Sequence, residues 1–266
     1  MKLGKKLLIA LGAVVVVAAI VAASVMGTIA YFTASSSVSN TFTVGDVKLV
    51  LDESKVDTDG NIVADGGRVD ANAYHLVPGS QYTKDPQVRI QKGSEDSYLF
   101  IIVRNDISTI EVGKDGAKSA NYLTIDEQLE LYGWHYYAAS PTGAIYVYCG
   151  NKYGNTDFEL PTEADEIEDA RAGITARTTW KTATAVDASG ENGATVDLFK
   201  YFYVDNDHSE LAIYSGAKVM ITAVAIQATF GAEQGFEAGS KGAVDLAWAA
   251  VVETYPYIHD NNTAAN

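Results

Sequence analysis

A strict alternation of side chains from residue 32 to residue 44 is the feature that most limits the fold of this chain. Every odd position carries a hydroxyl group, whereas Phe32, Ala34, Val38, Phe42 and Val44 occupy five of the even positions. A period of two is typical of a β-strand with one buried face. At about 3.3 Å per residue, the 13 residues would extend over roughly 43 Å, whereas a common strand has about five or six residues. We therefore expect the first half of this strand to lack a partner in its own domain.

The apolar phase reverses directly after this segment. Beyond Gly45-Asp46, the apolar residues Val47, Leu49 and Leu51 occupy odd positions. A β-bulge or a tight turn at Gly45 would produce such a reversal.

Further strand-like runs outnumber helical ones in the rest of the chain. Residues 97–103 are apolar after the first position, which predicts a central strand buried on both faces. Residues 196–204 and 217–230 are further candidate strands. Helical spacing of apolar residues is limited to 125–132 and 240–254. Because loops rich in glycine and aspartate separate these runs, we expect an all-β sandwich with short helical insertions.

The segment before the alternating strand has the features of an export signal. A lysine cluster at positions 2–6 precedes an apolar run at 7–26, as in the n- and h-regions of a signal peptide. Thr28 and Ala30 fit the −3 and −1 positions of a signal-peptidase site, which predicts cleavage between Ala30 and Tyr31. About 20 apolar residues can also span a bilayer, so an uncleaved signal anchor is the alternative. Both interpretations place everything after the apolar run outside the cytoplasm.

These boundaries divide the chain into three parts. Residues 1–30 are the predicted signal peptide, 31–44 an N-terminal extension, and 45–266 a single β-sandwich domain. The full chain has a net charge of −15, which argues against nucleic acid and anionic membranes as partners. Cys149 is the only cysteine, which excludes an internal disulfide and indicates a buried, unreactive thiol.

Residues 150–192 have the character of an insertion in this domain. Seven acidic residues and no basic residue lie between positions 157 and 169. Such a run is typical of a solvated loop or helix face. A contact with a divalent cation or a partner would require several of the carboxylates to converge on one point.

Metal-binding patterns are weak in this sequence. Asp57, Asp59 and Asn61 offer oxygen ligands at alternate positions, but position 12 of the corresponding calcium loop is Arg68 instead of a glutamate. We therefore expect a hairpin turn there and no cofactor, with calcium at these residues as the alternative. His208, in the polar cluster 205–210, is the one candidate zinc ligand, because the four histidines are scattered and no His-Glu-x-x-His pair occurs.

Several short segments, in their order and spacing, are similar to one family of exported proteins. They are GTIAYFT (27–33), NTFTVGDVKL (40–49), LVPGS (76–80), YTKDP (82–86) and SY (97–98). Together they resemble the TasA/camelysin family of Gram-positive exported proteins. The resemblance covers residues 1–105 and, more weakly, 223–252.

This resemblance implies both a fold and a function. It implies a jelly-roll-like β-sandwich that serves as a secreted subunit of biofilm matrix or cell-surface fibres, with its signal peptide removed by a signal peptidase of the SipW type. In TasA-like fibres the mature N-terminal segment is a donor strand that completes the sheet of the next subunit. Here that strand would be residues 31–44, and Phe32, Ala34, Val38, Phe42 and Val44 would enter the neighbouring subunit. A head-to-tail contact of this kind propagates into a homopolymer.

Two other functions remain open. Camelysins were classed as metallopeptidases of the M73 type, although no metal-ligand spacing is visible in this chain. A membrane-tethered surface or adhesion module, in which residues 7–26 are retained, is the third possibility. The insertion at 150–192 has no counterpart in the resemblance, so it would either decorate a fibre or cover its acceptor groove.

Overall fold

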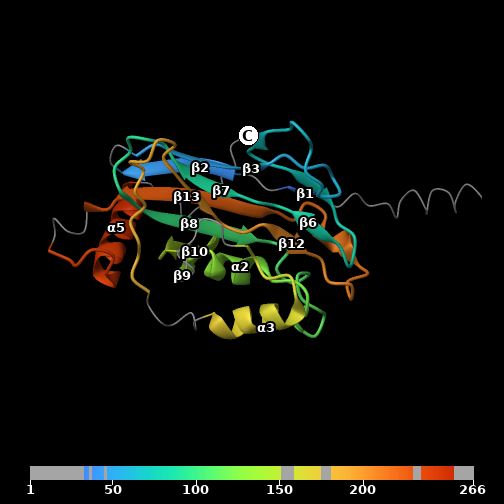
Figure 1. Ribbon diagram of the computed structural model, residues 1–266. Coiled ribbons are helices and arrows are strands. Elements are labelled where there is room, and N and C mark those ends of the chain that lie inside the picture. Colours follow the sequence, from blue (N-terminus) through green and yellow to red (C-terminus); the bar gives the residue numbers. More distant parts are fainter. Residues whose placement is uncertain are drawn as a thin grey trace, which may run out of the picture.

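Strands make up most of the regular secondary structure in the described residues, and helices are few (Figure 1). The computed structural model describes residues 33–35, 38–44, 47–150, 159–174, 181–229 and 235–254. Two larger sheets contribute apolar side chains to one shared core, and two small two-stranded sheets extend them. The sequence-based prediction of a mainly β fold with few helices is confirmed.

The larger sheet has five strands in the order β2-β13-β8-β10-β9. Their bounds are β2 (Val38–Val44), β13 (Val219–Gln227), β8 (Ser97–Asn105), β10 (Gly143–Tyr148) and β9 (Trp134–Ser140). Every pairing is antiparallel except that of β2 with β13, which is parallel. The first seven residues of β8 are all buried, which confirms the prediction of a central strand covered on both faces.

The second sheet has four strands in the order β11-β7-β3-β4. Their bounds are β11 (Ala194–Asp197), β7 (Gln87–Ile90), β3 (Leu49–Ser54) and β4 (Arg68–Val69). Val47, Leu49 and Leu51 are buried, so the apolar phase predicted after Gly45 is confirmed. The two small sheets pair β1 (Thr33–Ser35) with β5 (Ala73–His75), and β12 (Tyr201–Tyr203) with β6 (Gln81–Thr83).

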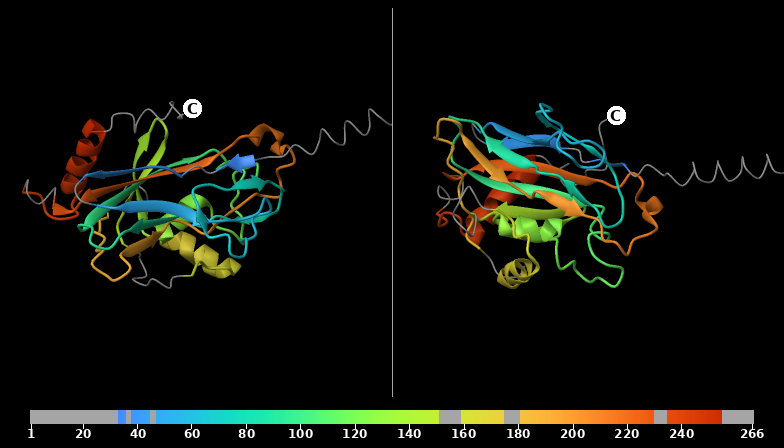
Figure 2. Two further views of the ribbon diagram at one scale, coloured as in Figure 1. Left: turned by 90° about the horizontal axis from the view of Figure 1, so that it is seen from above. Right: turned by 45° about the vertical axis from the view of Figure 1, so that its right-hand side comes forward.

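Helices cover the outer parts of this β structure. Helix α5 (Lys241–Thr254) places Val244, Ala247 and Trp248 in a second core against Phe100 of β8, at one end of the molecule (Figures 1 and 2). Helix α2 (Ile125–Leu131) begins with a capping box in which Thr124 and Glu127 bond each other's main-chain amide. Both helices were predicted from apolar spacing. A short 3₁₀ helix, η1 (Leu211–Tyr214), precedes β13.

The described part of the acidic segment forms helix α3 (Ala164–Gly173). Ile167 and Ala170 are buried against Leu123 and Leu131, whereas the acidic side chains from Glu159 to Asp169 that the structure describes are exposed. The interpretation as a solvated helix face is therefore confirmed for these residues. Asp157 lies outside the described residues.

The N-terminal extension departs from the prediction. Its described residues form β1 and β2, and both pair within their own chain, β1 antiparallel to β5 and β2 parallel to β13. The expectation that the first half lacks a partner in its own domain is wrong in this structure. A register shift opposite Ile221 and Ala223 also interrupts the pairing of β2. Phe32 and the predicted bulge or turn at Gly45-Asp46 lie outside the described residues.

Candidate functional site

The edge strand β2 is the first element of the candidate site. Thr41 lies opposite Ala223, Phe42 opposite Val224 and Val44 opposite Ile226. The chain continues from β2 into β3, which belongs to the other sheet, so no hairpin attaches β2 to its neighbour β13. The pairing therefore depends on main-chain hydrogen bonds and on the contacts of this one strand, and the same segment of a second copy can make them.

Strand β1 has a different neighbour, β5, with which it pairs antiparallel. Thr33 lies opposite His75 and Ala34 opposite Tyr74. Tyr74 is buried, and its ring lies edge-on to two other rings. The distance between ring centroids is 5.1 Å to Phe202 and 5.9 Å to Tyr82. This aromatic cluster fixes β5 to the core, so β5 offers a rigid edge to an added strand.

The predicted donor residues divide between these two strands. Ala34 lies in β1, and Val38, Phe42 and Val44 lie in β2. Phe32 and the predicted cleavage site at Ala30 and Tyr31 lie outside the described residues. In the described part of the chain, no helix is both long and apolar enough to cross a membrane, and residues 7–26 are not part of it.

The candidate calcium loop is a turn held by Asp57. Its Oδ1 accepts hydrogen bonds from the main-chain N–H groups of Asn61 at 2.9 Å and Asp59 at 3.0 Å. The bonds from Asn61 lower the pKa of this exposed carboxyl. Gly60 has a φ of +83° in this turn, and Val56 pairs with Ile62 in an isolated antiparallel β-bridge. The prediction of a hairpin turn is thus confirmed.

His208, the candidate zinc ligand, contacts a main-chain carbonyl group. Nε2 of His208 lies 2.7 Å from the carbonyl oxygen of Val112, which joins two loops. Among the residues that the structure describes, no group of three or more His, Cys, Asp and Glu side chains could hold a metal ion. Cys149 is half-buried, and burial raises its pKa to about 12, as expected for an unreactive thiol.

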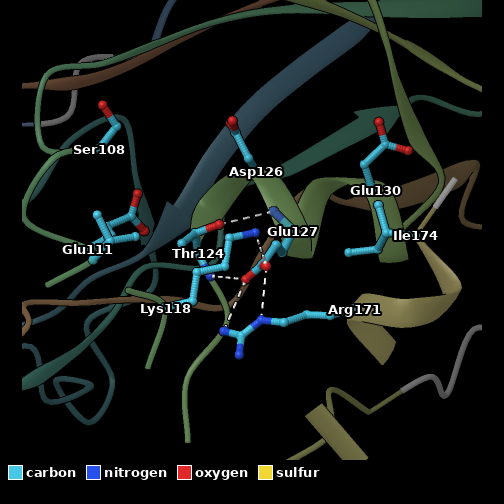
Figure 3. A pocket seen from close by; sticks show the side chains of 10 residues that line it. Ser108, Glu111, Lys118, Thr124, Asp126, Glu127, Glu130, Arg171 and Ile174 are labelled. Atoms are coloured by element: carbon cyan, nitrogen blue, oxygen red, sulfur yellow. Dashed lines mark hydrogen bonds and ion pairs between the residues drawn. The ribbon is translucent and has the colours of Figure 1, made fainter. Parts of the chain in front are cut away.

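A polar pocket of about 440 Å³ lies between α2, α3 and the loop at 108–118 (Figure 3). Glu127 accepts hydrogen bonds from Lys118 at 2.6 Å and from Arg171 at 2.9 Å. Glu130, at the far end of α2, contacts His135 at 3.4 Å and Lys181 at 3.2 Å. These contacts join α2 to α3, to β9 and to the segments that carry Lys118 and Lys181, so we interpret the pocket as structural. The pocket was not predicted from the sequence, although Thr124-x-x-Glu127 is the pattern of a capping box.

Glu111 is the one acid of this pocket with a strongly raised pKa. Its carboxyl group accepts hydrogen bonds from the main-chain N–H of Ile125 at 2.9 Å and from the Asn105 amide at 2.8 Å. Burial raises its pKa to about 8, and the nearby Asp126 and Glu127 add to the effect. Glu111 therefore supports the start of α2 while holding a proton at neutral pH.

This raised pKa predicts a pH dependence of stability. A proton held more tightly in the folded state stabilises it below pH about 4.5, and this contribution is lost as the pH rises through about 8. The free energy of unfolding of the wild type, relative to Glu111→Gln, should therefore fall by on the order of 2–4 kcal/mol between pH 5 and pH 8.5. Urea unfolding of both proteins at several pH values measures this change in the free energy of unfolding. Glu166→Gln, on the exposed face of α3, should follow the wild type, and parallel curves for Glu111→Gln would contradict the assignment.

Comparisons with known proteins found no relative of this chain. No protein-family model matches the chain, and neither the curated proteins nor the solved structures contain a match. The similarity to the TasA/camelysin family thus remains a prediction from the sequence segments.

Proposed function

We propose that this chain is an exported structural subunit of biofilm matrix or cell-surface fibres, similar to the TasA/camelysin family and with a jelly-roll-like sandwich. It polymerises by donating residues 31–44 to the next subunit. The observation that carries the proposal is the position of β2, a parallel edge strand added to β13 without a hairpin. This segment fills an acceptor edge in its own chain that an identical segment from another copy can fill equally well.

Polymerisation would be an exchange of equal partners. When β1 and β2 leave β5 and β13, the hydrogen bonds they lose are regained with the strands of a neighbour. The free-energy change is therefore small, and concentration and strain in the connecting residues decide the direction. Because each subunit gives its strand to one neighbour and receives a strand from another, the contact need not close and a filament results. Cleavage after Ala30 would free the strand from its membrane segment.

A reversible lock tests this exchange. Thr41→Cys with Ala223→Cys, in a Cys149→Ser background, places two thiols at paired positions of β2 and β13. Oxidised as a monomer, the mature protein beginning at Tyr31 should remain monomeric. After reduction, the same sample should form filaments visible by electron microscopy. Filaments from the oxidised monomer would contradict strand donation.

Deletion provides an independent test of the same proposal. Mature protein should form filaments, whereas a chain without residues 31–44 should remain monomeric and bind a synthetic peptide of that sequence. A peptide of the same composition with the alternation scrambled is the matched control. Filaments formed by the truncated chain would overturn the donor model.

A second function is favoured by the same pairings. Because β1 and β2 both pair within their own chain, the protein also fits a monomeric surface or adhesion module that retains residues 7–26 as an anchor. Sequencing the N-terminus of the exported protein separates the two, since a start at Tyr31 excludes the anchor.

A further inference from the structure

Three polar side chains from separate segments are buried together beside the aromatic cluster of β5. Glu53 lies in β3, Asn72 directly precedes β5, and Lys84 directly follows β6. Their exposed fractions are 0%, 7% and 1%. Lysine and glutamate are almost never buried so completely unless they are paired, and this placement has a large desolvation cost. A chemical role of these three side chains would account for their burial despite this cost.

The carboxylate of Glu53 connects the other two side chains. One oxygen, Oε2, accepts a hydrogen bond from Nζ of Lys84 at 2.5 Å, and the other, Oε1, accepts one from Nδ2 of Asn72 at 2.9 Å. The two oxygens of a single carboxylate thus bind an amine and a primary amide, each within reach of a proton transfer.

The amide of Asn72 is also fixed in orientation. Its Oδ1 accepts a hydrogen bond from the main-chain N–H of Val56 at 3.0 Å, and its Nδ2 donates a second bond to the carbonyl of Ser54 at 2.8 Å. A main-chain N–H on a carbonyl oxygen polarises the carbonyl and stabilises negative charge that develops there. The side-chain carbonyl carbon of Asn72, Cγ, is therefore more electrophilic and open to attack by a nucleophile.

The surroundings favour an uncharged amine. Burial lowers the pKa of Lys84, opposed by the charge of Glu53. Burial raises the pKa of the Tyr74 phenol, and the charge of the nearby Glu53 adds to the effect. The Tyr74 ring packs edge-on against Tyr82 and Phe202. A lysine that gives up its proton in an apolar site is a nucleophile.

We propose that Lys84 and Asn72 condense into an intramolecular isopeptide bond, with Glu53 transferring the protons. Glu53 accepts a proton from the Lys84 ammonium, and the freed Nζ attacks Cγ of Asn72. The Nζ–Cγ bond forms while the N–H of Val56 stabilises the oxyanion at Oδ1. Glu53 then passes its proton to Nδ2, the Cγ–Nδ2 bond breaks, and ammonia leaves, taking up the remaining proton of Nζ as ammonium. Charge and atoms balance, and no oxidant or other reactant is needed.

The bond would close residues 72–84 into a covalent loop that contains β5 and β6. Strand β5 is the partner of β1, so the bond would tie the start of one possible acceptor strand for the N-terminal segment to the end of β6. This inference does not depend on polymerisation, because the three residues belong to one chain.

Mass spectrometry of the full chain tests the proposal. The main species should be lighter than its sequence by one ammonia molecule. Trypsin should fail to cut after Lys84, which leaves a peptide of residues 69–89. Chymotrypsin, which cuts after Tyr74 and Tyr82 within the loop, should give pieces that remain joined through Asn72 and Lys84. An unchanged mass, or ammonia loss in separable peptides as from a succinimide at Asn72, would overturn it.

Variants assign the roles of the three residues. Lys84→Arg, Asn72→Ala and Glu53→Gln should each keep the full mass, whereas Lys92→Arg and Asn61→Ala, both exposed, should lose ammonia as the wild type does. Ammonia loss in any of the first three would count against the mechanism. The mass of the wild type decides the existence of the bond even if a variant does not fold.

Discussion

Replacement of Lys84 by methionine should lower the free energy of unfolding by about 3–5 kcal/mol, because it leaves the carboxylate of Glu53 buried without its cation. In a protein of this size, the melting temperature should fall by on the order of 10 °C. In a chain that has formed the proposed cross-link, Nζ of Lys84 is an amide N–H and not a cation, and the variant instead loses the covalent constraint that the bond places on the unfolded chain. Thermal unfolding followed by circular dichroism measures the change.

Two variants show whether the pair, and not the lysine stem alone, is responsible. Lys84→Met combined with Glu53→Gln removes both charges, and the introduced glutamine side chain can still accept the hydrogen bond from Asn72, so the double variant should recover part of the loss. Lys92→Met, at an exposed position, should stay within about 0.5 kcal/mol of the wild type. Equal stability of the single and the double variant would contradict an energetic role for the pair.

Elements with local patterns could be predicted from the sequence. Burial on both faces of β8 and the one-sided contact of α5 each leave a period in the order of side chains, so these elements were found close to their observed bounds. The turn at Asp57 was also predictable, because its hydrogen bonds join residues only two and four positions apart.

Partners that are distant in sequence could not be predicted in the same way. The alternation of residues 32–44 predicts a strand but not its neighbour, and the pairing with β13 joins segments from opposite ends of the chain. Parallel pairing leaves no hairpin turn between its strands to be recognised. The expected long strand without a partner was wrong for this reason.

The buried triad had a signal that was overlooked. Val47, Leu49 and Leu51 set an odd-numbered buried phase, and the next residue of that phase in β3 is Glu53. A charged residue at a position that the alternation assigns to the core requires a buried partner. The sequence could therefore predict that Glu53 has a partner, but only the fold identifies Lys84.

Gln128 is the site of the second large expected effect. This buried side chain of α2 accepts a hydrogen bond from the main-chain N–H of Lys200 at 3.0 Å, and its Nε2 donates to the carbonyls of Tyr201 at 2.9 Å and Leu123 at 3.2 Å. Gln128→Leu has a similar volume but would leave these main-chain groups buried without a partner. The free energy of unfolding should fall by about 3–4 kcal/mol, since each such group costs roughly 1–3 kcal/mol and relaxation recovers part of it.

The same variant should also slow the proposed cross-link. The carbonyl of Lys200, whose N–H is bonded to Gln128, accepts a hydrogen bond from the main-chain N–H of Lys84 at 3.0 Å, so α2 holds the segment that presents the amine. Gln128→Leu should therefore retain a larger fraction of uncondensed chain by mass, together with its lower melting temperature. Gln91→Leu, at an exposed position, is the matched control and should match the wild type in both measurements. Complete condensation in a destabilised Gln128→Leu would show that the triad is positioned by β3 and β5 alone.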